Sequence, residues 1–235
     1  MAQVGYSACV ELSACHNLSV RSKRTLNRKP VGKAAAGTRD RLVRAALKTL
    51  TQHGFSGATA RTIAAEARVN QALIFYHFGS VDHLLLAALD ATSEDRLARY
   101  RSWLADINKF SDLVDAMDRL YKEDIVSGHI TAVQEMVAGA SSVPALRRQV
   151  LERMTPWVAF AREVLGRMVS GTVVEKMVSI DDLAFAAVAF YFGIETLTNL
   201  AGDRAQAQAL FEAGRRLAPV VDAVLQSASW VGETA

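Results

Sequence analysis

The segment from Gly54 to Leu84 constrains the fold more than any other part of the chain, because its pattern predicts two very short helices around a tight turn. Thr59 is a suitable N-cap for the first helix, since its hydroxyl accepts a hydrogen bond from a free backbone N–H. Arg68 to Asn70 forms the turn, and Gln71 to His77 forms a second helix that ends at Gly79. Helices this short do not fold alone, so the pair must rest on a longer helix.

A longer helix precedes the pair, from about Thr38 to His53. Its apolar side chains recur at helical spacing, and Gly54 ends it. These side chains are Leu42, Val43, Ala46, Leu47 and Leu50. The apolar residues of the first short helix also share one face, and they are Ile63, Ala64 and Ala67. The three helices therefore form one small unit, and a helix-turn-helix of this size fits its last helix into a DNA major groove.

The same stretch resembles the DNA-binding domain of the TetR family of bacterial transcriptional regulators. The matching positions are the helix Arg39–His53, Gly54-Phe55, Thr59, Ile63-Ala64, Ala67, Val69, the run Ala72-Leu73-Ile74-Phe75-Tyr76-His77-Phe78, and Leu84. The family usually has Gly at position 68 and Lys at position 81, where this chain has Arg68 and Val81. In the family that lysine bonds a DNA phosphate, which Val81 cannot do. Arg68 and the basic residues before Arg39 are the candidates to replace the missing charge.

The resemblance predicts which side chains contact DNA. At the start of the second short helix, the Gln71 amide matches the N6 and N7 edge of adenine, and Ala72 and Leu73 suit thymine methyl groups. Tyr76 and His77 lie one turn further on and suit phosphates. The full set of predicted DNA contacts is Thr59, Arg61, Asn70, Gln71, Ala72, Leu73, Tyr76 and His77. The side chains expected to face inward and hold the helix on its support are Ile74, Phe75 and Phe78.

The charge of the chain is divided unevenly along its length. Residues 1–89 hold 12 Lys and Arg against 4 Asp and Glu, a net charge of +8, whereas residues 90–235 hold 15 against 20, a net charge of −5. A basic front and an acidic back fit a polyanion-binding domain attached to a body that avoids DNA. We therefore divide the chain into a disordered basic arm at 1–36, a helix-turn-helix DNA-binding domain at 37–97 and an effector-binding and dimerisation domain at 98–235. The arm either follows DNA phosphates or is a solvated leader.

Other features of the sequence disfavour several classes of protein. Its two cysteines, Cys9 and Cys15, both lie in the arm, where they are either solvated thiols or a regulatory disulfide. This usage indicates a reducing compartment. The scattered histidines and carboxylates predict no metal site, no cofactor and no enzyme, because they form no ligand or nucleophile–base set. The longest apolar run, Leu183 to Ile194, has 12 residues, whereas a membrane span needs about 20. The sequence therefore predicts a soluble cytoplasmic protein.

The predicted fold is all-α, with a three-helix DNA-binding head, a helical ligand-binding and dimerisation body, and about nine helices in all. A single short recognition helix gives little specificity, and such domains act as two-fold dimers on pseudo-palindromic DNA. The helix near 181–201 is apolar on nearly every side, which indicates a dimer interface formed with the last helix, near 203–227; the alternative is an ordinary core helix. The predicted interface residues are Phe185, Ala189, Phe192, Leu197, Phe211, Leu217 and Val221.

Regulators of this family bind a small molecule between the helices of the body, and binding changes the separation of the two heads. The resemblance makes six residues candidates to line an effector pocket: Trp103, Met117, Tyr121, Met136, Trp157 and Phe160. The alternative is that aromatic and methionine side chains at this spacing form an ordinary core. Few charges fall on the inferred inner faces, which predicts an uncharged hydrophobic or aromatic effector.

The function that follows is a sequence-specific transcriptional regulator that acts as a homodimer and is released from a palindromic operator by a small hydrophobic effector. We expect it to be a repressor, although an activator stays open because the polarity depends on operator position, which no residue encodes. The alternative class is a nucleoid-type or architectural DNA binder without an effector, which would use the basic arm. A footprint at one palindrome, rather than broad coating of DNA, separates the two.

Overall fold

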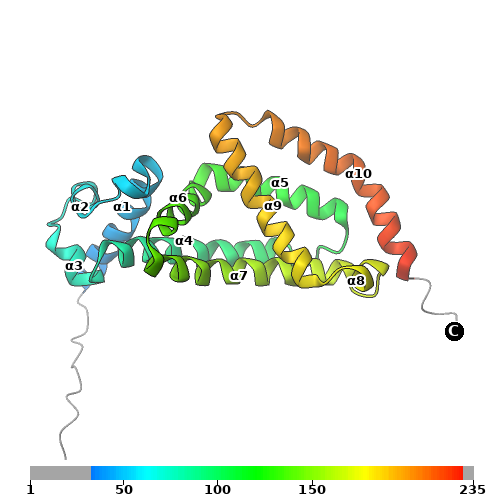
Figure 1. Cartoon of the computed structure of the whole chain (residues 1–235), viewed down its shortest axis with the longest axis horizontal. Coiled ribbons are helices and arrows are strands. Elements are labelled where there is room, and N and C mark those ends of the chain that lie inside the picture. The colour runs from blue at the N-terminus through cyan, green and yellow to red at the C-terminus, as the bar shows by residue number, and fades with distance from the viewer. Residues whose placement is uncertain (1–32, 230–235) are drawn as a thin grey trace, which may run out of the picture.

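Ten α-helices make up residues 33–229, the part of the chain that the computed structural model describes, and no strand occurs among these residues. The helices are α1 Lys33–Gly57, α2 Ala60–Ala67, α3 Ala72–Phe78, α4 Val81–Trp103, α5 Phe110–Ser127, α6 His129–Ser142, α7 Pro144–Val169, α8 Val173–Met177, α9 Ile180–Ala201 and α10 Ala205–Ser229. Helices α1 to α3 form a head at one end of an elongated molecule, and the other helices form the body (Figure 1). The all-α prediction is confirmed, and the short α8 is the element that it missed.

The head is held together by the apolar faces that the sequence predicted. Leu42 and Leu50 of α1, Ile63 of α2, Ile74 of α3 and Leu84 of α4 are all fully buried in one core. Burying a side chain of this size stabilises a fold by about 1.5–3 kcal/mol. This core fixes the angle of α3. The basic arm expected at 1–36 lies outside the described residues, except that α1 already begins at its residue 33.

The regular part of the first helix ends at Gly54 as predicted, and a further helical turn follows across a kink. Gly54 has φ 70° and ψ 178°, a backbone conformation that glycine adopts readily and other residues do not. The helical turn beyond the kink reaches Gly57. The kink directs Phe55 away from the axis of α1 and toward the body.

The head meets the body at α6. The Glu135 carboxylate of α6 accepts a hydrogen bond from the backbone N–H of Phe55 at 2.8 Å. Gly139 lies one turn further along α6, against the Phe55 ring. A Cβ atom added to Gly139 would be 2.4 Å from an atom of this ring. The contact therefore requires a residue without a side chain at position 139, and it ties the end of α1 to α6.

The long helices of the body pack in pairs. Helix α7 packs against α9, and α10 packs against α5; α9 runs obliquely to α7 (Figure 1). Asp222 of α10 accepts hydrogen bonds from the backbone N–H groups of Phe110 and Ser111, at 2.6 and 3.3 Å. These donors belong to the first turn of α5, where a helix has no internal acceptors for them. Arg215 of α10 also pairs with Asp115 of α5 at 2.7 Å, so α10 is fixed to α5 at two places.

Helix α9 has the length and apolar composition of a membrane-spanning helix, and 11% of its most apolar window is buried within the chain. Its packed face carries two buried residues, Ala184 and Glu195. A buried carboxylate on a helix that packs along α7 is typical of a helix in a protein interior or interface.

Candidate DNA-binding and effector sites

The predicted caps of the helix-turn-helix are confirmed. The Thr59 hydroxyl accepts a hydrogen bond from the backbone N–H of Thr62 at 3.2 Å, and the Thr62 hydroxyl accepts one from the Thr59 N–H at 2.9 Å. This reciprocal capping box satisfies two donors at the start of α2. The Asn70 side-chain oxygen accepts from the N–H of Ala72 at 2.8 Å, and Ser80 caps α4 in the same way as Thr59 caps α2.

The turn between α2 and α3 passes through Arg68, the one described residue other than glycine with a positive φ. Its φ of 55° and ψ of 48° lie in the left-handed region, and its N–H donates to the carbonyl groups of Ala64 and Ala65. This conformation costs a residue with a Cβ atom about 1–2 kcal/mol. The Arg68 side chain is exposed. Its charge therefore lies on the surface, on a residue whose backbone is strained.

Replacing Arg68 with glycine is expected to raise the free energy of unfolding by about 1 kcal/mol, because glycine adopts the left-handed region without strain. Urea denaturation followed by circular dichroism measures the change. Arg68→Ala is the matched control, since it removes the same charge but keeps the Cβ atom. If the glycine and alanine variants are equally stable, backbone strain at position 68 is excluded. If Arg68 replaces a missing phosphate contact, both variants should reduce the salt dependence of DNA binding.

The two faces of α3 differ sharply. Ile74 is fully buried, and Phe78 is half-buried beneath the Arg39 guanidinium, which lies 5.1 Å from its ring centroid. Away from this buried side, Tyr76 is 79% exposed, and Gln71 at the start of the helix is exposed as well. Helix α3 is thus fixed from beneath and presents a polar and aromatic surface outward.

Phe75 does not face inward, so that prediction was wrong: it is 50% exposed. On a helix, residues three or four apart share a face. Phe75 and Tyr76 follow the exposed Ala72 by three and four residues, whereas the partly buried His77 and Phe78 follow the inward Ile74 by three and four. This spacing was the signal that sequence reasoning missed. Phe75 extends the apolar part of the outward face, which suits contact with thymine methyl groups.

The other predicted DNA contacts lie around this face. Arg61 is exposed on α2. Leu73 is partly buried and packs against the head core. His77 is also partly buried, and its ring makes an edge-on contact with Tyr76 at a centroid distance of 5.0 Å. The Thr59 hydroxyl is engaged in its cap. The DNA-contact roles of these residues stay predictions.

The six residues predicted to line an effector pocket lie in separate cores. Met136 is buried in the core shared by head and body, and Tyr121 packs on Phe211 and donates its hydroxyl to Thr198 at 3.1 Å. The remaining four belong to or pack against a core around Tyr100, and they are Trp103, Met117, Trp157 and Phe160. Within residues 33–229, none of the six lines the groove beside α7 or the small pocket beside the turn between α9 and α10.

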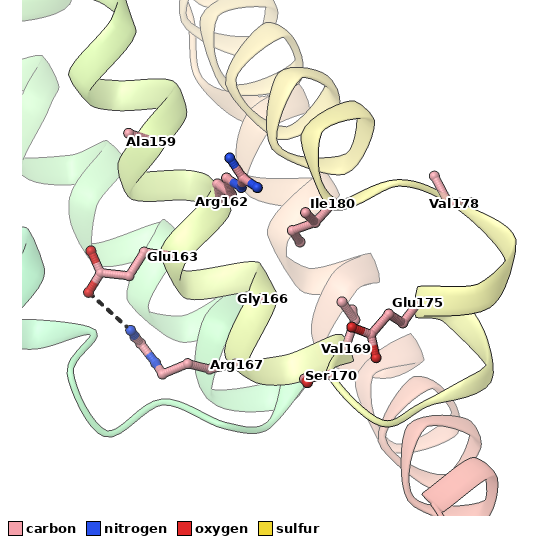
Figure 2. A pocket seen from close by; sticks show the side chains of 10 residues that line it. All are labelled: Ala159, Arg162, Glu163, Gly166, Arg167, Val169, Ser170, Glu175, Val178 and Ile180. Carbon is pink, nitrogen blue, oxygen red and sulfur yellow. Dashed lines mark hydrogen bonds and ion pairs between the residues drawn. The ribbon is translucent and has the colours of Figure 1, made fainter.

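The larger of these pockets is an open groove of about 770 Å³ between α7, α8 and the start of α9 (Figure 2). Its charged side chains are engaged by neighbours. Arg167 pairs with Glu163 at 3.3 Å, and Arg162 pairs with Asp181 at 3.2 Å. Glu175 accepts a hydrogen bond from a backbone N–H at 2.7 Å. The charged groups of this groove are therefore already paired, and they leave few polar atoms for a ligand to bind.

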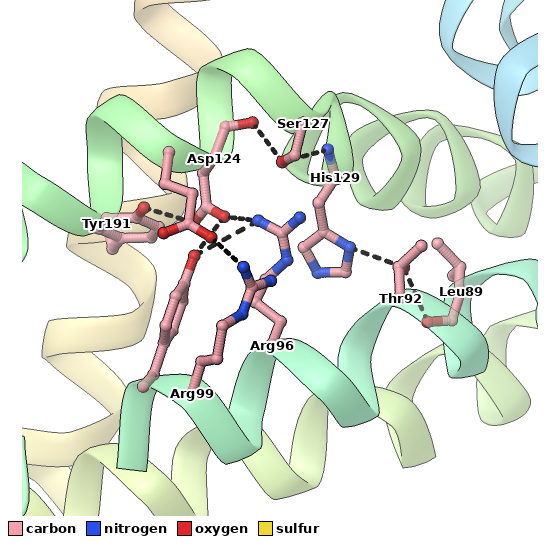
Figure 3. Close-up of polar contacts among 10 residues, drawn as sticks. Leu89, Thr92, Arg96, Arg99, Asp124, Ser127, His129 and Tyr191 are labelled. Carbon is pink, nitrogen blue, oxygen red and sulfur yellow. Dashed lines mark hydrogen bonds and ion pairs between the residues drawn. The ribbon is translucent and has the colours of Figure 1, made fainter. Parts of the chain in front are cut away.

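A buried polar cluster occupies the centre of the body (Figure 3). The Asp124 carboxylate accepts hydrogen bonds from Arg96 and from the hydroxyls of Tyr100 and Tyr191, the latter two at 2.6 Å. The expectation of few charges on the inner faces was wrong, because four ionisable residues are buried here: Arg96, Asp124, His129 and Glu195. Each comes from a different helix, so no single helix shows a charged inner face in its sequence.

The surroundings of this cluster shift its protonation equilibria. Burial and the nearby Arg96 lower the pKa of His129 to about 3, so this imidazole is neutral. Burial and Asp124 raise the pKa of Tyr100 and of Tyr191, which therefore stay hydroxyl donors. Burial, with Asp124, also raises the pKa of Glu195 to about 7.

Helices α9 and α10 carry large exposed apolar side chains. Among the predicted interface residues, Leu197 is 68% exposed, and Phe185, Ala189 and Leu217 are exposed as well. Phe192 and Val221 are partly buried, whereas Phe211 is buried inside the subunit. Further exposed apolar side chains on these helices are Phe190, Leu200, Leu210, Val220 and Val224. The dimer-interface role of this face stays a prediction.

The head is the part of the chain whose sequence matches a known family. A sequence model of the family described as "Bacterial regulatory proteins, tetR family" matches residues 42–88, from α1 into α4. The chain is 35% identical over 72 residues to the HTH-type transcriptional repressor NicS of Pseudomonas putida, a match that covers 29% of this chain and 34% of that protein. The chain thus spans about a third of the length of this curated relative.

Likeness to solved structures extends over head and body together. A TetR-family member from Streptomyces coelicolor A3 is 26% identical with a TM-score of 0.57, covering 77% of this chain and 98% of that chain. The multidrug binding protein EbrR, complexed with imidazole, is 25% identical with a TM-score of 0.54, covering 78% and 90%. The matched family consists of bacterial regulatory proteins and not of enzymes. The head thus carries the helix-turn-helix domain of the TetR family of bacterial regulatory proteins, and head and body together share the fold of a TetR-family member.

Proposed function

We propose that this chain is a homodimeric transcriptional repressor whose α3 contacts operator bases and which a small-molecule effector releases from DNA. The observation that carries the proposal is the outward face of α3. Gln71, Ala72, Phe75 and Tyr76 are exposed on a helix that Ile74 fixes from beneath. A side-chain amide next to apolar groups matches the donor, acceptor and methyl pattern of bases in the major groove.

The apolar face of α9 and α10 supports the homodimer. Phe185, Leu197 and Leu200 are all more than half exposed, and soluble monomers rarely expose a large contiguous apolar patch. The small side chain of Ala189 permits the close approach of a second helix. A two-fold axis across this face pairs two heads, and paired recognition helices contact half-sites about 34–36 Å apart or a multiple of that distance.

The names of two similar proteins support repression and ligand binding. NicS is named a transcriptional repressor, and EbrR is named a multidrug binding protein. For this chain we infer a regulator that acts in the bacterial cytoplasm, where its operator lies, and that binds its effector in the body. The contact of Glu135 and Gly139 with Phe55 is the path by which a change in the body reaches the head.

Selection from a library of random duplexes is expected to enrich one pseudo-palindromic sequence. On that sequence Gln71→Ala should weaken binding about tenfold, because a bidentate amide–adenine contact contributes about 1–3 kcal/mol. On random DNA the loss should be much smaller. Fluorescence anisotropy at fixed salt measures both affinities. Gln52→Ala, which removes an exposed glutamine of α1, is the control and should change neither.

Two outcomes would contradict parts of this proposal. An equal loss on both kinds of DNA in Gln71→Ala would show that Gln71 contacts phosphate or nothing. A library that yields no enriched sequence, together with uniform coating of long DNA, would favour an architectural DNA binder.

A further inference from the structure

One oxygen of a buried carboxylate in the body lacks a hydrogen-bond donor. Glu195 of α9 is 4% exposed, and its Oε1 atom has no hydrogen-bond partner among the described residues. A buried charged oxygen without a donor is strongly destabilising, so such groups are normally paired. Burial and the nearby Asp124 both disfavour the charged form of Glu195, and they raise its pKa to about 7.

Glu195 lines a pocket of about 120 Å³ where α5 meets the turn between α9 and α10. Ile125 contributes an apolar wall, and Asp203 contributes a second carboxylate. The remaining lining residues are Thr198, Asn199, Gly202 and Arg204. Pockets that enclose a drug-sized molecule have about 300–1,000 Å³. This pocket is therefore large enough for one polar group of a few heavy atoms.

We propose that this pocket binds a small organic cation with N–H donors, such as an ammonium, amidinium or guanidinium group, and that one donor reaches Glu195 Oε1. The cation is the polar end of the effector, so this inference rests on the proposed function. An anion would meet two carboxylates against the single cation of Arg204, and an apolar group would leave Oε1 unsatisfied. In the groove beside α7, by contrast, the carboxylates of Glu163 and Glu175 already have partners.

The wall of the pocket is connected to the head through α6. The Asn199 amide donates to Gln134 Oε1 at 2.8 Å, and the Gln134 amide donates to Thr196 Oγ1 at 3.0 Å. The residue after Gln134 is Glu135, which accepts the hydrogen bond from the Phe55 N–H of the head. A cation that shifts this end of α9 therefore acts on the residue next to the head contact. Differential contacts of this kind couple two sites.

Methylguanidinium is a suitable probe, and methylurea is its neutral isostere. Calorimetric titration of the full chain without DNA should show methylguanidinium binding at least about tenfold more tightly than methylurea, because a charged donor strengthens the hydrogen bond to a carboxylate. Glu195→Gln keeps the shape of the side chain and should weaken methylguanidinium binding about tenfold to a hundredfold. Arg204→Gln removes a competing cation from the pocket and should strengthen it.

Glu152→Gln removes an exposed carboxylate of α7 and should leave the affinity unchanged; circular dichroism verifies that each variant is folded. Equal binding of the two probes, equal affinity of the wild type and Glu195→Gln, or no binding of methylguanidinium at millimolar concentration would overturn the inference. None of these results touches operator selection, because the titration contains no DNA. Failure of operator selection with intact methylguanidinium binding would instead contradict the proposed function.

Discussion

Replacing Asp124 with alanine is expected to lower the free energy of unfolding by about 3–5 kcal/mol, because it leaves a buried charge without its partner. The Arg96 and Asp124 side chains are 5% and 2% exposed. Arg96 would lose its carboxylate, and the hydroxyls of Tyr100 and Tyr191 would lose their acceptor. Urea denaturation monitored by circular dichroism measures the loss.

Two further variants separate this explanation from a general sensitivity of α5. Asp115→Ala, on the same helix, removes a carboxylate that pairs with Arg215 at the surface, and it should cost at most about 1 kcal/mol. The double replacement Asp124→Leu with Arg96→Met should recover part of the stability, because it removes both charges together and leaves only the Tyr100 and Tyr191 hydroxyls without their acceptor. Equal losses for Asp115→Ala and Asp124→Ala would contradict the central role of the buried pair.

Replacing Leu197 with glutamate is expected to convert the proposed dimer to monomers and to weaken operator binding at least about a hundredfold. The physical reason is that an unpaired charge buried in an apolar interface costs several kcal/mol, and each 1.4 kcal/mol is about a factor of ten. Sedimentation velocity measures the mass, and gel-shift titration measures operator affinity. The two measurements should change together, because a lone head contacts a single half-site.

Leu151→Glu is a closely matched control for this substitution. Leu151 of α7 is 66% exposed and Leu197 of α9 is 68% exposed, so both variants place the same charge on a similarly exposed leucine. Leu151→Glu should leave mass and operator affinity as in the wild type. A dimeric Leu197→Glu protein with normal operator binding would exclude the outer face of α9 as the interface.

Much of the head was predictable because its determinants are local in sequence. The Thr59, Asn70 and Ser80 caps each depend on a side chain and a backbone group two or three residues away. The apolar faces of α1 and α2 follow helical spacing. The orientation of Phe75 was predicted wrongly. An aromatic residue between Ile74 and Tyr76 can face either way, and only its helical spacing from the exposed Ala72 indicates that it faces outward.

The centre of the body was not predictable, because it depends on residues far apart in the chain. Asp124 lies 28 residues from Arg96 and 67 residues from Tyr191. Arg96 and Asp124 stand among other charged residues on their helices, where each has the appearance of a solvated position. Only the packing of α4, α5 and α9 brings them together. The contact between Phe55 and Gly139 was not predictable for the same reason, because these two residues are also far apart in the chain.

That contact sets a condition for exchanging parts between regulators. A chimaera that joins this head to a different body would keep the head in place only where the acceptor helix has no side chain opposite Phe55. The same helix must carry a carboxylate four residues earlier, as Glu135 precedes Gly139 here. The portable unit is therefore larger than the helix-turn-helix and includes α6. A crossover placed between the head and α6 would separate Phe55 from its partners Glu135 and Gly139.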